Sequence, residues 1–467
     1  MTQPTPLASD SNSPPSLFDD HFLDDATLDL PSVPEQLSIP RGVPRVKRPV
    51  RDQIEYCELC LDDLVPLDHP VRAVWTFVMA QDLSAMYDKI EAVEGDAGRS
   101  AIDPKILMAL WLFATVEGVG SAREIERLTT RDAPFRWICG GVSVNHNRLS
   151  QFRTGSSELL DEVLTNSVAV LMQQNLVTLT RVAQDGIRVR ANAGKSSFRR
   201  EASLQQLHEE AKQQIEALKP AADEQPSEAS ARQKAARHRA ATEREARIAK
   251  ALEALPKLKA AREKRKKGDG EKTRVSTTDP EARVMKMANG GFNPAYNIQF
   301  STDTTSGIIV GVAASNEGSD AGLLIPMLEQ IEQRYGVTPD EALVDGGYMK
   351  TDDIIDVAKS GIVLYLPVKE VEKKQKKGID PYAPLPNDAP ETAAWRQRMG
   401  LPESKEIYKE RASTAEWVNA QARNRGLQQF LVRGLQKVKD VAMWFAIVHN
   451  LVRALTLRPE SVEIAVS

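Results

Sequence analysis

The spacing of apolar side chains predicts helices from about residue 55 to residue 180. In this region apolar positions recur every three or four residues, which is the period of an amphipathic helix. Asp103-Pro104 supplies a cap residue and then a proline at the first helical position, ahead of the apolar helix Ile106–Val116. Short helices joined by turns suit a helix-turn-helix-like module, but a generic helical domain fits the same pattern. The other helices predicted here are 121–130, which begins with the capping box Ser121-Ala122-Arg123-Glu124, 147–153 and 158–174.

Beyond residue 180 the hydrophobic pattern changes to the two-residue period of strands. Arg181–Arg190 alternates in this way, and two later strands around a polar turn indicate a hairpin. Strands then alternate with helices, an order that predicts a mixed α/β sheet of five strands. The predicted strands are 181–190, 294–301, 307–314, 341–344 and 362–368; the predicted helices are 323–335, 351–359, 407–424 and 438–456, with a basic, proline-rich loop at 369–400.

Residues 200–275 interrupt this sheet with a stretch rich in Ala, Glu, Lys and Arg that carries no strand signal. Apolar residues recur at three- and four-residue spacing on both sides of a proline-containing break, which predicts an inserted antiparallel helical hairpin. Its second arm, residues 231–274, holds 16 Lys and Arg against 6 Asp and Glu, a local charge of +10. This arm is either a solvated helix face or, as we expect, a contact for the DNA backbone.

The composition is that of an ordinary soluble globular protein. The chain has 61 Lys and Arg against 65 Asp and Glu, a net charge of −4, and 41% of its residues are hydrophobic. This balance excludes a histone-like basic protein but not a nucleic-acid partner, because local basic patches set the field that DNA meets. Residues 1–40 contain seven acids, seven prolines and no Lys or Arg, so we expect a disordered tail. The basic arm that follows, either a linker or a phosphate contact, holds Arg41, Arg45, Lys47, Arg48 and Arg51.

Three cysteines in 467 residues exclude a disulfide scaffold and fit a reducing cytoplasm. Cys57 and Cys60 form a CxxC without a second pair, which favours two structural cysteines over a zinc site. The longest apolar run, Ile106–Val116, is about half of the ~20 residues that cross a membrane, and the first residues lack the basic start and apolar core of a signal peptide. We therefore expect a soluble cytoplasmic protein without a membrane partner.

Three acidic residues lie where a structural role explains them poorly. Asp185 lies within a core strand, Asp345 ends a strand before two glycines, and Glu416 lies in a late helix. Strand interiors disfavour Asp, and a buried unpaired carboxylate is costly, although Asp345 could simply begin a turn. In a ribonuclease-H-like sheet the first and fourth strands are parallel neighbours. Asp185 and Asp345 would then lie side by side, and Glu416 would close the cluster.

A cluster of carboxylates consists of hard oxygen ligands, which suit Mg²⁺ or Mn²⁺ rather than zinc. Two such ions about 3.5–4 Å apart can clamp the attacking and leaving oxygens of a phosphoryl displacement. The sequence has no Walker-type glycine loop and no Ser-His-Asp order, and its six histidines lack ligand spacing. Other chemistries therefore have little support.

Three motifs around these acids resemble the DDE transposases of bacterial insertion sequences, whose catalytic domain is ribonuclease-H-like. The first is Asp185-Gly-Ile-Arg-Val-Arg-Ala-Asn-Ala, and the second is Leu343-Val-Asp345-Gly-Gly-Tyr348. The third, Tyr408-x-x-Arg411…Glu416…Arg423-Asn-Arg-Gly, is similar to the family's tyrosine–arginine–glutamate–lysine signature, with Arg423 where the family usually has lysine. The resemblance covers about residues 45–457 and includes the block Ala101–Arg153.

This resemblance implies a transposase that performs metal-dependent cleavage at the ends of a mobile DNA element and strand transfer into target DNA. Asp185, Asp345 and Glu416 would be its catalytic residues and its ligands for two Mg²⁺ or Mn²⁺ ions. It further implies a homodimer in the active complex, acting on terminal inverted repeats and target DNA in the cytoplasm, at the nucleoid. The residues expected to contact DNA are Tyr408, Arg411, Arg423, Arg425, Arg148, Arg153, Lys264, Arg265, Lys266 and Lys267.

These features predict the organisation of the whole chain. Residues 1–50 are the disordered acidic tail and basic arm, and 51–178 an all-α DNA-binding domain. Residues 179–457 are a ribonuclease-H-like catalytic domain with flanking helices, interrupted by the basic hairpin of 200–275, and 458–467 are a C-terminal tail. The alternatives are a metal-dependent nuclease without strand transfer, and a catalytically idle DNA-binding protein derived from a transposase.

Overall fold

The computed structural model describes residues 60–91, 100–218 and 228–458. All of them belong to the larger of the two units into which contacts divide the chain, residues 59–467. The tail and arm expected at 1–50, Cys57, and all but the first residue of the expected C-terminal tail lie outside the described residues. Cys60, the described member of the CxxC pair, is a free and exposed thiol.

The first described part of the chain, up to residue 174, is helical. Two of its helices begin at the caps indicated by the sequence: the Asp103 carboxylate accepts the backbone N–H of Lys105, and the Ser121 hydroxyl accepts that of Glu124. The helix after Asp103 is buried along most of its length, which explains its uninterrupted apolar sequence. The elements are a 3-10 turn (Leu61–Leu64), α1 (Pro70–Met79), α2 (Ser84–Tyr87), α3 (Pro104–Val116), α4 (Ala122–Arg131), α5 (Ala133–Cys139), α6 (His146–Thr154) and α7 (Ser157–Gln173).

These helices pack on the rest of the chain through its last helix, α16 (Leu435–Leu457). Trp444 on α16 donates its indole N–H to the backbone oxygen of Arg153 at 3.2 Å, and its ring lies against Phe152. One apolar core runs through both parts of the chain. Separate cores therefore do not mark the boundary between 51–178 and 179–457, and this division stays a prediction from the sequence.

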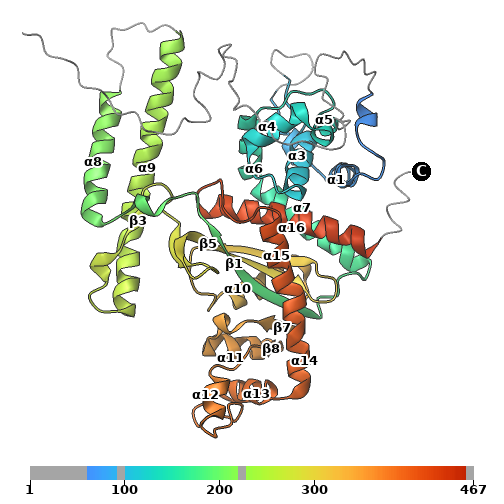
Figure 1. Cartoon of the computed structure of the whole chain (residues 1–467), viewed down its shortest axis with the longest axis vertical. Coiled ribbons are helices and arrows are strands. Elements are labelled where there is room, and N and C mark those ends of the chain that lie inside the picture. Colours follow the sequence, from blue (N-terminus) through green and yellow to red (C-terminus); the bar gives the residue numbers. More distant parts are fainter. Residues whose placement is uncertain (1–59, 92–99, 219–227, 459–467) are drawn as a thin grey trace, which may run out of the picture. The chain divides into compact units, whose positions relative to one another are not determined.

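The second part is built on a mixed sheet with β1 at its centre (Figure 1). β1 pairs antiparallel with β5 and parallel with β7, and β7 pairs parallel with β8. β4 and β6 both pair antiparallel with β5. This mixed α/β architecture is consistent with a ribonuclease-H-like fold. The strands are β1 (Arg181–Arg190), β4 (Arg283–Lys286), β5 (Phe292–Asp303), β6 (Ile309–Ser315), β7 (Glu341–Val344) and β8 (Val363–Tyr365).

The sheet has six strands, one more than the five expected. The additional strand, β4, forms a short hairpin with the start of β5, in which Arg283 opposes Ala295 and Lys286 opposes Phe292. Four residues are too few for a two-residue period to stand out in a sequence, so this strand gives no separate signal.

The segment 369–400 was expected to be a loop, and this expectation is wrong. It contains α12 (Val371–Gln375) and α13 (Pro390–Arg398). Pro390 occupies the first turn of α13, where proline favours a helix instead of breaking it. Trp395 on α13 is buried and donates its indole N–H to the backbone oxygen of Leu366 at 3.0 Å. The remaining helices of this part are α10 (Leu324–Tyr335), α11 (Thr351–Lys359), α14 (Pro402–Arg411) and α15 (Trp417–Asn424).

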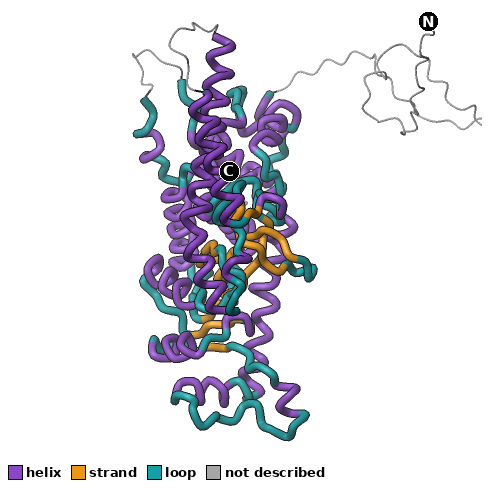
Figure 2. The backbone as a smooth tube through the Cα atoms, turned by 90° about the vertical axis from the view of Figure 1, so that its left-hand side faces the viewer, coloured by secondary structure: helices purple, strands orange, loops and turns teal. Residues whose placement is uncertain are grey.

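Between β1 and β4 the chain leaves the sheet as two helices, α8 (Glu201–Ala217) and α9 (Glu228–Arg265), which lie side by side (Figure 1, Figure 2). They share a small apolar core of their own, in which Leu204 of α8 packs with Ile248 and Leu255 of α9. Two short strands close the base of the pair. These strands are β2 (Phe198–Arg199) and β3 (Val275–Ser276), and the flanking 3-10 turns are Lys195–Ser197 and Gly270–Lys272.

By length and composition alone, α16 could cross a membrane: its mean hydropathy is 1.2 over the most apolar window. In the fold it is a core helix, with 56% of that window buried. Asn450 exchanges two hydrogen bonds of 2.8 Å with the backbone of Ile309 on β6. This packing is consistent with a soluble protein.

The burial of His449 on α16 predicts a pH dependence of stability. Desolvation lowers the pKa of His449 to about 4, and its Nε2 lies 2.9 Å from the backbone oxygen of Gly307. Because the folded state depresses this pKa, the stabilisation is complete above pH ~6.5 and is lost as the pH falls toward 4. We expect a loss of up to about 3 kcal/mol over this range, and a flatter profile for His449→Gln, both measured by calorimetry. Equally steep profiles for the two proteins would show that protonation of His449 does not cause the loss of stability.

The DNA contact that the sequence predicts for the basic end of α9 would make binding depend on salt. Lys264, Arg265, Lys266 and Lys267 are all exposed. Replacing the four by Gln should reduce the slope of log affinity against log salt by about 0.9 for each DNA phosphate that the variant no longer binds. Exchanging the lysines for arginine, and the arginine for lysine, keeps the charge and should keep the slope. An unchanged slope in the Gln variant would identify this segment as a solvated helix end.

Candidate active site

The parallel pairing of β1 and β7 places two carboxylates at neighbouring strand positions. Gln184 opposes Val344 in the register, so the residue after each of them, Asp185 on β1 and Asp345 after β7, lies beside the other. The Asp345 carboxylate accepts the backbone N–H of Gly347 at 2.7 Å and so begins a 3-10 turn, Gly346–Tyr348. Asp345 thus serves as a turn residue and as a neighbour of Asp185 at the same time.

Glu416 comes from a helix whose middle turn is wider than an α-helix. Between α14 and α15 the chain forms a π turn, Ala412–Glu416. Residues five apart lie about 140° apart around a regular α-helix, so Arg411 and Glu416 could not meet there. The π turn brings an Arg411 Nη within 3.0 Å of a Glu416 carboxylate oxygen. The regular helix expected at 407–424 is therefore wrong at this turn, and the irregularity joins two site residues.

Arg411 connects the elements of the site. Its guanidinium lies 3.2 Å from Asp185 Oδ2 and 3.0 Å from Glu416 Oε1, and its Nε donates to the Tyr408 hydroxyl at 3.2 Å. Tyr408 in turn donates to the backbone oxygen of Val344 at 3.2 Å. The Arg411 side chain is 13% exposed. It pairs with two carboxylates and ties α14 to the middle of β1 and, through Tyr408, to the end of β7.

Burial determines the electrostatics of Asp185. Desolvation raises the pKa of its carboxyl above the ordinary value, and the charges of Asp345 and Asp320 raise it further. Arg411 and a backbone N–H oppose this rise. Asn419 on α15 adds a hydrogen bond of 3.1 Å from its Nδ2 to Asp185 Oδ2. The charged form of Asp185 therefore depends on the donors around it.

A fourth carboxylate, Asp320, lies behind the strand ends and was not predicted. It is buried and accepts hydrogen bonds from Asn297 at 2.6 Å, Gln299 at 2.9 Å and Arg188 at 2.9 Å. A Cβ at Gly186 would lie 2.7 Å from an Asp320 oxygen, so this close approach requires glycine there. Asn297 and Gln299 alternate with apolar residues in a strand whose two faces are both buried. Buried polar residues in such a strand are the signal that could have indicated a polar network.

The carboxylates of Asp185, Asp345 and Glu416 are hard oxygen donors, so the donor chemistry fits a divalent cation. A cation, the Arg411 guanidinium, already bridges two of the three. As arranged, the described residues contain no group of three or more His, Cys, Asp or Glu side chains that could hold a metal ion. A metal ion held between Asp185 and Glu416 would compete with Arg411 for their oxygens.

The basic residues expected to contact DNA differ in exposure. Arg148, Arg423 and residues 264–267 are exposed. Arg153 is 7% exposed: it lies over the Trp111 ring and donates to the backbone oxygen of Gly120 at 2.6 Å. Burial lowers the pKa of Arg153 to about 10. The Arg153 guanidinium thus lies in the core, and its contact with DNA stays a prediction.

Two further residues expected to contact DNA are partly buried. The Tyr408 hydroxyl is already bonded within the site, and desolvation raises its pKa. Desolvation lowers the pKa of Arg425, whose backbone packs close to Gly118. Tyr408 holds α14 against the end of β7. The contact of both residues with DNA stays a prediction.

Two protein-family models match the chain. The model described as Transposase domain (DUF772) matches residues 59–155, and the model described as Transposase DDE domain matches residues 385–455. The first match covers α1 to α6; the second includes Glu416 but neither Asp185 nor Asp345. A comparison with curated proteins finds no match, and neither does a comparison with solved structures.

The position of Arg411 predicts how the site responds to cations. Because a guanidinium and a divalent cation compete for the same carboxylates, Arg411→Gln should bind Mg²⁺ more tightly, by about tenfold, or about 1.4 kcal/mol. Calorimetric titration of Mg²⁺ into the DNA-free protein measures this, with terbium luminescence as a second readout. Arg423→Gln removes an equal charge without touching the carboxylates and should change the affinity much less. Weaker binding by Arg411→Gln would mean that Arg411 organises the carboxylates for the metal.

Proposed function

The chain is a DDE-type transposase of an insertion element, and on this basis we propose that it cuts DNA at the ends of that element and joins the freed 3′-hydroxyl groups to target DNA. One observation carries the proposal: Asp185 and Asp345 follow matching positions of parallel strands, and Arg411 joins Glu416 to Asp185. Asp345 follows the carboxyl end of β7, and the carboxyl ends of parallel strands are where open α/β sheets place their ligands. The site therefore lies where a substrate can reach it.

DDE transposase domains use divalent metal ions, and we propose that this chain uses two Mg²⁺ or Mn²⁺ ions. Asp185, Asp345 and Glu416 would hold them. Bound there, such ions lower the pKa of the attacking oxygen and neutralise charge on the phosphoryl group. The surrounding side chains then have to orient the carboxylates and the DNA.

Asn419, Tyr408 and Arg411 are suited to these positioning tasks. Asn419 keeps its hydrogen bond to Asp185 when Arg411 withdraws, and so fixes the rotation of that carboxylate. Tyr408 holds α14 against the end of β7 through the backbone of Val344. Arg411, once released, is a planar cation beside the reacting phosphate, where it can bind two phosphate oxygens at once.

Transposases act on DNA, and we propose that this chain binds the terminal inverted repeats of its element as well as target DNA. The basic segment Lys264–Lys267, Arg148 on the N-terminal helices and Arg423 beside the site would contact the backbone. Two copies of the chain would supply one active site for each end of the element, which supports a homodimer in the active complex. We expect this complex in the cytoplasm, at the nucleoid.

A metal-dependent nuclease without strand transfer would use the same carboxylates. A catalytically idle DNA-binding protein is favoured by one observation, the ion pairs that Arg411 makes with two of the acids. Incubation with element-end DNA, target DNA and Mg²⁺ separates the three. Joined products indicate a transposase, cut but unjoined ends a nuclease, and bound but uncut DNA an idle protein.

The triad gives the most direct prediction. Asp185→Asn, Asp345→Asn and Glu416→Gln keep the shape of each side chain but remove one negative charge. Each should reduce cleavage and joining together by at least about a hundredfold, because both steps would use the same charge stabilisation. Binding to element ends should survive, since it depends on basic residues elsewhere. Cleavage, joining and mobility-shift assays on the same preparations measure all three effects.

The control for this series is Asp352→Asn, which alters an exposed acid at the start of α11. Its neighbour Asp353 is unsuitable, because it is buried and pairs with Lys350 at 2.7 Å. The triad assignment fails if a triad amide retains normal cleavage in Mg²⁺, or if Asp352→Asn costs as much as Asp345→Asn.

A further inference from the structure

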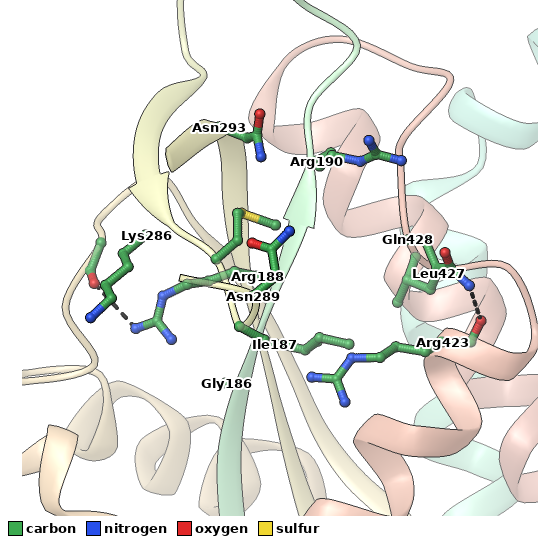
Figure 3. A pocket seen from close by; sticks show the side chains of 13 residues that line it. Gly186, Ile187, Arg188, Arg190, Lys286, Asn289, Asn293, Arg423, Leu427 and Gln428 are labelled. Atoms are coloured by element: carbon green, nitrogen blue, oxygen red, sulfur yellow. Dashed lines mark hydrogen bonds between the residues drawn. The ribbon is translucent and has the colours of Figure 1, made fainter. Parts of the chain in front are cut away.

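A cavity of about 800 Å³ opens beside the candidate active site. It begins at Gly186, the residue after Asp185, and its walls come from β1, the β4–β5 hairpin and the end of α15 (Figure 3). None of the three carboxylates lines it. The proposed chemistry therefore leaves this space without a role.

The lining of the cavity is basic. Arg188, Arg190, Lys286 and Arg423 contribute four positive side chains, and the described residues that line the space include no Asp or Glu. Arg188 pairs with Asp320 at 2.9 Å. The other three form no ion pair within the described part of the chain. Uncompensated positive charge around a concave surface attracts phosphate groups.

Neutral groups complete the lining. Asn289, Asn293 and Gln428 carry amides, and Ile187 and Leu427 add apolar surface. The Gln428 amide already donates to the backbone oxygen of Arg423 and the Asn289 oxygen accepts the backbone N–H of Gly291, so each keeps part of its hydrogen-bonding capacity. Figure 3 shows Arg423 reaching toward β1 from α15, with Lys286 on the opposite side of that strand. The cavity thus offers cations on both sides and amides between them, which matches the mixture of phosphate, sugar and base in a nucleotide.

The volume of the cavity and its position restrict the class of ligand that it can bind. Cavities of about 300–1,000 Å³ hold single small ligands, so this space suits one or two nucleotides and not a duplex. Arg423 follows Glu416 by seven residues, about 10 Å along the helix axis. Measured along the axis of a DNA duplex, where one strand rises about 3.4 Å per phosphate, this distance spans about three nucleotides. A strand with its reacting phosphate at the carboxylates would therefore pass Arg423 within a few nucleotides.

We propose that this cavity binds an unpaired stretch of the DNA strand next to the reacting phosphate, with Arg190, Lys286 and Arg423 on its phosphates. The inference rests on the proposed function and adds a binding site to it. The ligand class is a single-stranded oligonucleotide, held mainly by charge and with little sequence preference. Duplex DNA would be gripped elsewhere, by α9 and the N-terminal helices.

The test compares two DNA probes in EDTA: a labelled hexathymidylate and a blunt duplex of sixteen base pairs. Arg190→Gln and Lys286→Gln should each weaken hexathymidylate binding by about three- to tenfold, and each should lower the salt slope for this probe by about 0.7. Binding of the duplex should change by less than about twofold. Fluorescence anisotropy at several salt concentrations measures both quantities, and Arg190→Lys should restore the slope.

The matched control is Lys359→Gln, which removes an exposed lysine at the end of α11, away from the lining. It should leave the hexathymidylate affinity unchanged. Parallel losses for both probes would overturn the proposal and make the cavity part of a general duplex surface. Unchanged binding of hexathymidylate would overturn the proposal as well, and would mean that the basic residues of the cavity only face solvent.

Failure here can be told apart from failure of the proposed function. The binding assay contains no metal and no element end, so its result does not depend on whether the chain cuts or joins DNA. The triad variants, in contrast, report on cutting and joining alone. Loss of selective single-strand binding with an intact triad result would remove the cavity site and keep the transposase chemistry.

Discussion

Carboxylates can gather at the end of a sheet only when positive charge accompanies them. Like charges in a partly buried place repel one another and resist desolvation, and the raised pKa of Asp185 records both effects. Arg411 offsets part of this repulsion because it pairs with Asp185 and Glu416. Arg188 offsets the charge of the neighbouring Asp320, with which it forms an ion pair. The site therefore depends on two arginines that compensate charge on opposite sides of β1.

Backbone geometry makes this compensation possible at two points. The π turn between α14 and α15 lets Arg411 and Glu416 share one helix face although they are five positions apart. Gly186 leaves room on β1 for Asp320 to approach the strand from behind. Neither feature contributes a charged group of its own. Each one determines where a charged group can lie.

The sequence predicts the regular parts of the fold well, because regular elements have a period. The bounds of β1, β7 and α11 agree with the expected bounds residue for residue. Prediction from the sequence fails for features that depend on the three-dimensional surroundings of a residue. Arg153 looks like any surface arginine in the sequence, yet it lies against Trp111 in the core. Asp320 escapes prediction for the same reason, since its partner Arg188 lies far along the chain. The π turn escapes prediction because a single widened turn leaves no period in the sequence.

The pair of helices α8 and α9 leaves the sheet and returns to it through two short paired strands, in which Phe198 opposes Ser276. The helical pair has an apolar core separate from that of the sheet, and its first and last residues are held together by the pairing of β2 with β3. Adding or removing whole helical turns would change the reach of the basic helix α9 and leave the register of β1 and β7 intact. The length of this helical pair can therefore change independently of the strands that carry the acids.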